Sequence, residues 1–103
     1  MKYQYGFPSV SIEKAFEKSL LKIPQINTRE NIRQAIEKLA DNPRPFGTKP
    51  FKQLNPPIGF YEYTAHYRIR IGDYRVLYDV DDEKKIVWIL ALRRRREETY
   101  KSW

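Results

Sequence analysis

The chain has 103 residues, and among them are no cysteine, one histidine and four glycines. Without cysteine it can form neither a disulfide nor a thiolate nucleophile, and with one histidine it lacks the ligands of a typical zinc site. Its longest apolar run, Ile86–Leu92, is far shorter than the roughly 20 residues of a membrane-spanning helix. The first residues, MKYQYGF, contain no apolar segment of a secretory signal. We therefore expect a cytoplasmic protein without a metal or cofactor.

Acidic residues are fewer than basic ones, 13 against 20, which gives a formal net charge of +7. Four of the acids occur in one stretch, Asp79–Glu83, so the rest of the chain is more cationic than its net charge indicates. Such a charge favours nucleic acid, an acidic protein or a membrane surface as partner. The membrane ranks last, because neither predicted helix combines its basic residues with large exposed apolar ones.

Two amphipathic helices are predicted in the first half of the chain. The first has apolar residues at steps of three and four, beginning at Ile12, and ends at Pro24. The second is predicted to begin at Asn27, whose side chain would cap it together with Glu30 in a capping box. It ends before Pro43. Each helix therefore has one apolar face that needs a partner.

Four strands are predicted around these helices. The first lies at Lys2–Phe7 or at Ser9–Ile12, because a proline divides this segment. After the second helix, a proline-rich connection extends from Asp41 to about Gly59, which is long for a small domain and typical of a functional loop. The remaining strands are predicted at Phe60–Ile71, Tyr74–Val80 and Lys85–Leu92.

The stretch from Tyr67 to Tyr78, YRIRIGDYRVLY, has the pattern of a β-hairpin. Apolar and charged residues alternate on both sides of Gly72-Asp73, which suits a two-residue loop because glycine tolerates positive φ. This loop would pair Arg70 with Arg75. Like charges on directly opposite residues destabilise a sheet, so such a face is expected to bind an anion. The arginines that share it are Arg68, Arg70 and Arg75.

These elements predict an α+β fold, in which a strand and two helices precede a mainly antiparallel sheet and a short basic C-terminal tail follows it. Two helices can cover only one face of such a sheet. The other face would carry the three arginines and apolar surface suited to a protein partner. That apolar surface would include Leu77, with Trp88, Leu90 and Leu92 on or beside it.

Residues 65–92, AHYRIRIGDYRVLYDVDDEKKIVWILAL, resemble the RelE/ParE superfamily of toxins from type II toxin–antitoxin systems, and the segments FEKSLLKIP, IEKLADNP and FKQL add to the resemblance. It covers most of the chain and implies one toxin domain over residues 1–103, with a βααβββ fold. RelE-like members cleave messenger RNA in the ribosomal A site without a metal. ParE-like members instead poison DNA gyrase.

The resemblance also implies site residues. The RelE-like pattern has basic residues on the first hairpin strand, an arginine on the second, and a basic residue and a tyrosine near the C-terminus. The C-terminal histidine of many relatives is absent here. The positions that match are Arg68, Arg70, Arg75, one or two of Arg93 to Arg96, with Arg94 or Arg95 favoured, and Tyr100.

Basic residues at all these positions favour a ribosome-dependent mRNA endonuclease that is held inactive by a cognate antitoxin protein and contacts mRNA and ribosomal RNA. Arginine stabilises a phosphorane well but is a poor general base, because its pKa lies far above 7. His66 precedes the motif by one residue and shares the arginine face by alternation; a polar strand residue is the simpler interpretation. The alternatives are a gyrase inhibitor without nuclease activity and a non-catalytic member that binds RNA or antitoxin.

Overall fold

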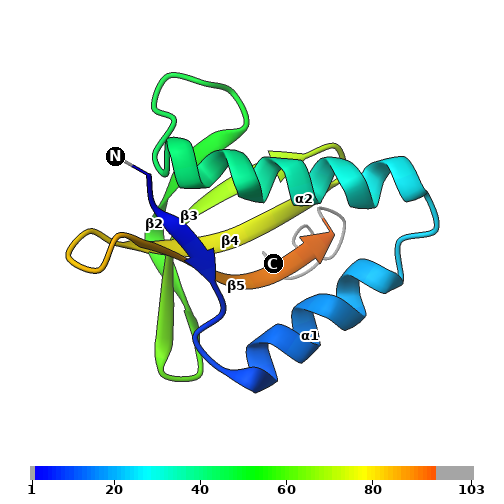
Figure 1. Ribbon diagram of the computed structural model, residues 1–103, viewed down its shortest axis with the longest axis horizontal. Helices are drawn as coiled ribbons and strands as arrows, with labels where there is room; N and C mark the ends of the chain where they lie inside the picture. Colours follow the sequence, from blue (N-terminus) through cyan, green and yellow to red (C-terminus); the bar gives the residue numbers. More distant parts are fainter. Residues whose placement is uncertain (1, 95–103) are drawn as a thin grey trace.

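The computed structural model describes residues 2–94, which form one five-stranded sheet and two helices (Figure 1). The strand order is β1-β5-β4-β3-β2, with β1 parallel to β5 and all other neighbours antiparallel. The predicted α+β class is confirmed, with one strand more than expected. In chain order the elements are β1 (Gln4–Gly6), α1 (Val10–Leu21), α2 (Ile26–Asp41), β2 (Phe51–Phe60), β3 (Tyr63–Ile71), β4 (Tyr74–Asp81) and β5 (Ile86–Arg94).

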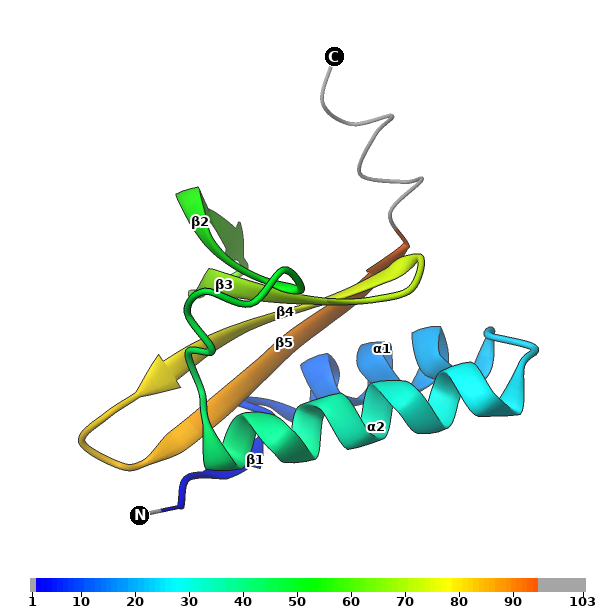
Figure 2. The ribbon, with the colours of Figure 1, turned by 90° about the horizontal axis from the view of Figure 1, so that it is seen from above.

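Both helices lie on the same side of the sheet, as predicted (Figure 2). The side chain of Ser9 caps α1 by accepting a hydrogen bond of 3.1 Å from the Ile12 N–H. The buried residues of α1 are Ile12, Phe16 and Leu20, at the spacing of one helical face. Between residues 2 and 94, neither helix is long and apolar enough to cross a membrane.

The predicted start of α2 is wrong. The helix begins at Ile26, its N-cap residue is Gln25, and no side chain makes a capping hydrogen bond. The Arg29 N–H donates to the Gln25 carbonyl over 3.2 Å and so closes the first turn before a capping box could form. Asn27 and Glu30 both lie within the helix.

The N-terminal strand is in the first of the two predicted segments. β1 pairs with β5 in the register Gln4 to Ile86 and Gly6 to Trp88. The second segment, Ser9–Ile12, is instead the N-cap and the first turn of α1. α1 and α2 together form the connection from β1, at one edge of the sheet, to β2, at the other edge.

The predicted long connection and the predicted strand Phe60–Ile71 are both partly wrong. β2 occupies the second half of the former, from Phe51 to Phe60, at the edge of the sheet. The two prolines of β2 lie where its register with β3 shifts, between Gln53 and Ile58, so the ladder loses no regular hydrogen bond to them. A turn with Tyr61 at positive φ then separates β2 from β3.

The β2–β3 hairpin covers part of the sheet face that lies away from the helices (Figure 2). Leu77 and Leu90 point to this face and are only 1% and 4% exposed. They form a second hydrophobic cluster with the β2–β3 side chains Leu54, Ile58, Phe60, Tyr63 and Ala65. The expected exposed apolar surface at Leu77 and Leu90 is therefore wrong, because the hairpin is folded over it.

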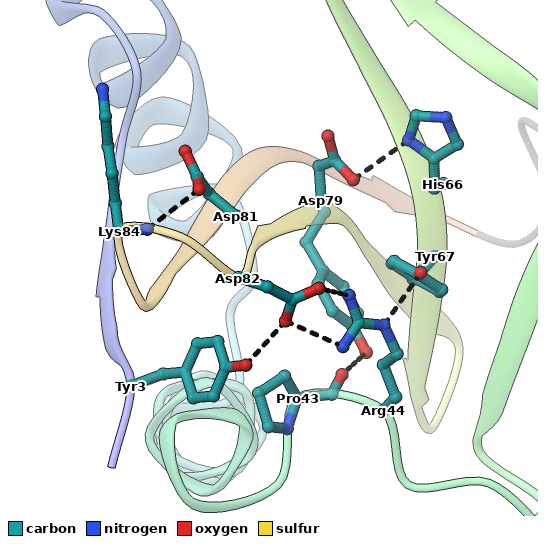
Figure 3. Close-up of polar contacts among 10 residues, drawn as sticks. Tyr3, Pro43, Arg44, His66, Tyr67, Asp79, Asp81, Asp82 and Lys84 are labelled. Carbon is teal, nitrogen blue, oxygen red and sulfur yellow. Dashed lines mark hydrogen bonds and ion pairs between the residues drawn. The ribbon is translucent and has the colours of Figure 1, made fainter. Parts of the chain in front are cut away.

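The main core lies between the helices and the sheet, and Tyr78 is its largest fully buried side chain. The Tyr78 hydroxyl donates a hydrogen bond of 2.6 Å to the Pro43 carbonyl oxygen, in the segment that follows α2 (Figure 3). Burial raises the pKa of this hydroxyl well above its ordinary value of 10.0. The core residues are Phe16, Leu20, Ile23, Ile32, Ile36, Leu39, Phe51, Ile69, Val76, Tyr78, Val87, Ile89 and Leu92.

Tyr78→Phe is expected to lower the free energy of unfolding at neutral pH by about 1–2 kcal/mol, because the Pro43 carbonyl loses its donor. The native state holds the Tyr78 proton more tightly than the unfolded state, whose tyrosines lose theirs near pH 10. The contribution of Tyr78 is therefore complete below pH 10 and is lost as the pH rises further. Urea unfolding between pH 7 and pH 11 should show the wild type losing this advantage over the variant. If the difference in unfolding free energy between the wild type and Tyr78→Phe stayed the same from pH 7 to pH 11, the raised pKa of Tyr78 would be contradicted.

Candidate functional site

Arginines from three strands form a row on the sheet face away from the helices. Arg70 of β3 pairs with Arg75 of β4, as predicted, and Arg75 pairs on its other side with Arg93 of β5. Their neighbours Ile69 and Val76 point to the helices, and alternation therefore directs the arginines to the opposite face. Arg68 stands on the same face, two residues before Arg70. We call Arg68, Arg70, Arg75 and Arg93 the arginine cluster.

The side chains of the cluster make several contacts with uncharged groups. Arg68 Nη1 donates to the Pro50 carbonyl oxygen at 2.9 Å, and the Arg93 guanidinium lies 5.0 Å from the centre of the Phe60 ring. Arg75 Nε is enclosed by protein and, within the described residues, has no hydrogen-bond partner. None of the ion pairs formed between residues 2 and 94 includes Arg70, Arg75 or Arg93.

Arg94, which the sequence pattern assigned to this site, points to the other face. It pairs with Tyr74, and its guanidinium lies 5.9 Å from the centre of the Tyr74 ring, on the side of the helices. The cause is a register shift of one residue between β4 and β5 at Leu77/Tyr78. If the register at the β4–β5 turn continued without this bulge, Arg94 would lie on the same face of the sheet as Arg75.

The same shift explains two further differences from the sequence prediction. It brings Arg93 to the arginine cluster, and it turns Leu92 into the helix-side core, where this residue is 7% exposed. The sequence gives no local signal for the bulge, since Leu90 and its neighbours are all apolar. Arg95 and Tyr100 lie outside the described residues, so their predicted roles stay predictions.

The three arginines of the row project from neighbouring strands whose backbones lie about 5 Å apart. Each like-charge neighbour costs the sheet some tenths of a kcal/mol, and an anion bound across the row would offset this cost. Guanidinium groups match the paired oxygens of a phosphate, so a chain of phosphates suits the row better than a single carboxylate. Within residues 2–94, no group of three or more His, Asp or Glu side chains could hold a metal ion.

Residues 10–99 match the family model described as "ParE toxin of type II toxin-antitoxin system, parDE". The chain belongs to this toxin family. A search of curated protein sequences gives no match.

Solved structures place the toxin close to the RelE branch in fold. The archaeal RelE–RelB complex from Pyrococcus horikoshii OT3 contains a chain with 27% identity and a TM-score of 0.68, covering 92% of the toxin and 97% of that chain. The RelBE2 complex from Mycobacterium tuberculosis contains a chain with 24% identity and a TM-score of 0.62, and the match covers 92% of the toxin and 100% of that chain. A mutant of E. coli toxin RelE in the free state has 21% identity and a TM-score of 0.52, and the match covers 97% of the toxin and 92% of that chain. The last two similarities show a shared fold.

A polar network on the helix side of the toxin fixes the loop after α2 against the sheet (Figure 3). Arg44 donates to both carboxylate oxygens of Asp82, at 3.1 and 2.7 Å, and its Nε donates to the Tyr67 hydroxyl at 2.9 Å. Tyr3 donates to Asp82 at 2.6 Å. The bonds from Arg44 and then Tyr3 lower the pKa of Asp82 to about 2, and Asp82 in turn raises the pKa of Arg44. This network holds structure together and lies apart from the arginine cluster.

Proposed function

We propose that this toxin is an endonuclease that cleaves messenger RNA on the ribosome and so inhibits translation in the cytoplasm. The observation that carries the proposal is the row Arg70, Arg75 and Arg93, three fixed cations on neighbouring strands without ion-pair partners in the described residues. Their guanidiniums would hold the mRNA backbone and stabilise the charge that develops on the phosphorane. The positive net charge would favour the approach to ribosomal RNA.

Inhibition of DNA gyrase is the second candidate, because the family model that matches is named for ParE toxins. The two functions leave different products. With purified ribosomes and a labelled mRNA, the proposed endonuclease yields cleaved mRNA; with gyrase and supercoiled plasmid, an inhibitor of the other kind yields linear DNA. Linear DNA together with intact mRNA would overturn the proposal. Neither product, with antitoxin binding retained, would indicate a non-catalytic member.

The cognate antitoxin is proposed to bind a groove between α2 and the C-terminal end of β3. This groove, about 550 Å³ in volume, is mostly apolar, with Leu39, Ile69 and Ile71 among its lining residues. Lys38 and Arg70, the latter a member of the arginine cluster, also line it. An antitoxin segment with aliphatic anchors beside acidic residues would fit both parts. By covering Arg70, it would also keep RNA from the cluster.

Binding of the antitoxin is expected to slow as salt increases. The complementary charges would accelerate association, and the Debye length falls from about 30 Å at 0.01 M to about 3 Å at 1 M ionic strength. Over this range we expect the association rate constant to fall by about tenfold or more, with a smaller change in the dissociation rate. Stopped-flow or surface plasmon resonance experiments with the antitoxin encoded by the neighbouring gene would measure both rate constants. An association rate that does not respond to salt would exclude the electrostatic part of this interface.

A further inference from the structure

The toxin has one histidine, His66, and the structure places it beside an aspartate on the face that carries the arginine cluster. His66 Nδ1 lies 3.0 Å from an Asp79 carboxylate oxygen, between β3 and β4. Figure 3 shows both side chains on the far side of the sheet from Tyr67, Arg44 and the α2 helix. The pair is therefore separate from the polar network of the helix side.

The surroundings of this pair form a site that a substrate can reach. The side chains of His66 and Asp79 are 44% and 34% exposed. They line a hollow of about 480 Å³ together with the aromatic side chains of Tyr63 and Trp88 and the buried Leu90. Aromatic and apolar walls around a polar pair are suited to a nucleobase or a ribose next to the reacting phosphate.

The hollow lies next to the arginine cluster along the strands. His66 and Arg68 are two residues apart on β3 and point to the same face, which sets their Cα atoms about 7 Å apart. On β4, Asp79 shares the face of Arg75, with Leu77 between them. An RNA strand held by the arginines would therefore extend toward His66.

Cleavage at this cluster lacks one component that arginine cannot supply. Attack by a ribose 2′-hydroxyl requires a group that accepts its proton, and guanidinium is permanently protonated near neutral pH. Histidine is the side chain whose ordinary pKa suits that task. An aspartate that accepts a hydrogen bond from the Nδ1–H group leaves the lone pair of Nε2 available, as in other histidine–carboxylate pairs.

We propose that His66 is the general base of the toxin and that Asp79 is its positioning residue; this inference rests on the proposed mRNA cleavage. Nε2 of His66 takes the proton of the 2′-hydroxyl while the bond from O2′ to phosphorus forms. The bond from phosphorus to O5′ breaks, and the leaving oxygen takes a proton from water. The products are a 2′,3′-cyclic phosphate and a 5′-hydroxyl, and His66 then returns its proton to the solvent.

His66→Gln is expected to slow mRNA cleavage on purified ribosomes by about 100- to 10,000-fold, the usual contribution of a general base. Because His66 is half-exposed, the variant should retain its circular dichroism and its melting temperature. His66→Ala should regain part of its activity when imidazole is added, whereas imidazole should not restore Arg75→Ala. The cleavage rate of Asp79→Asn should lie between those of the wild type and His66→Gln. Asp73→Asn, which removes one carboxylate from the β3–β4 turn, away from the His66–Asp79 pair, is the matched control and should cleave at the wild-type rate.

The pH dependence of the cleavage rate distinguishes a base from a residue that only supports the hollow. A cleavage rate that depends on a general base should fall in acid as that base becomes protonated, and His66→Gln should lose this dependence. Among the described residues, the charged and titratable groups around His66 are Asp79 on β4, Glu62 in the turn before β3, Tyr63 at the start of β3, and Arg68 two residues further along that strand. The β5 neighbours in the hollow, Trp88 and Leu90, do not titrate.

The possible results distinguish a failure of the proposed role of His66 from a failure of the proposed endonuclease function. If the wild type cleaves mRNA and His66→Gln cleaves equally fast, His66 is not the base, while the proposed function stands. If His66→Gln is slow but keeps the pH profile, and imidazole does not restore His66→Ala, the role of His66 is structural and the inference is wrong. If the wild type cleaves no mRNA on ribosomes, the proposed function and the inference are both overturned.

Discussion

Arg75→Ala is expected to reduce mRNA cleavage by about 100- to 1000-fold while leaving the toxin folded. Arg75 is the middle member of the row, with Arg70 on one side and Arg93 on the other. A phosphate bound across the row would therefore contact Arg75 whichever neighbour it also contacts. Losing one preorganised donor to the charge of a transition state typically slows catalysis by this amount. Single-turnover cleavage of a labelled mRNA on ribosomes would measure it.

Folding should tolerate the change, for two reasons. Removing Arg75 relieves like-charge repulsion with both neighbours, which is worth some tenths of a kcal/mol for each pair. It also removes a buried N–H, Arg75 Nε, that has no hydrogen-bond partner within residues 2–94. Arg33→Ala, which removes a positive charge from an exposed position of α2, is the control for net charge and should cleave normally.

Arg75→Lys separates the charge from its geometry. An ammonium keeps the positive charge but cannot grip two phosphate oxygens with a planar fork. We therefore expect Arg75→Lys to cleave mRNA faster than Arg75→Ala but more slowly than the wild type. A folded Arg75→Ala protein that cleaves mRNA as fast as the wild type would remove the basis of the endonuclease proposal. Inhibition of gyrase would then be the better interpretation of the family match.

The central hairpin could be predicted from the sequence because all of its determinants are local. Gly72 adopts the positive φ that the two-residue loop requires, and the resulting register pairs Ile69 with Val76 and Arg70 with Arg75 as expected. Alternation then decides which face each side chain occupies, without reference to the rest of the chain. The two helices were predictable for a similar reason, since each has its own apolar face.

Features that depend on contacts between distant segments could not be predicted in this way. β2 was missed because its prolines and its register shift hide the period of two. The bulge between β4 and β5 was missed because its residues are apolar on both sides, and it exchanged the positions of Arg93 and Arg94 relative to the cluster. The pairing of His66 with Asp79 joins residues thirteen positions apart, so only the hairpin register brings it about.

Leu77→Ala is expected to lower the free energy of unfolding by about 2–5 kcal/mol, a large part of the total for a small domain. The sequence pattern placed Leu77 on an exposed surface that a partner would cover. In the structure it is 1% exposed, and the β2–β3 hairpin packs over it through Leu54, Ile58 and Phe60. Truncating it would leave a cavity under this hairpin, because a close-packed core collapses only partly around a missing side chain.

Leu21→Ala is the matched control, since the same chemical change at a position that is 65% exposed should cost about 0.5 kcal/mol or less. Urea unfolding of both variants would give the comparison. The difference matters for function because the hairpin over Leu77 also brings the Phe60 ring to the Arg93 guanidinium and Tyr63 to the hollow of His66. A loosened hairpin should therefore reduce mRNA cleavage in Leu77→Ala even where the protein remains mostly folded. A stability loss no larger than that of Leu21→Ala would show that the hairpin leaves this face of the sheet open.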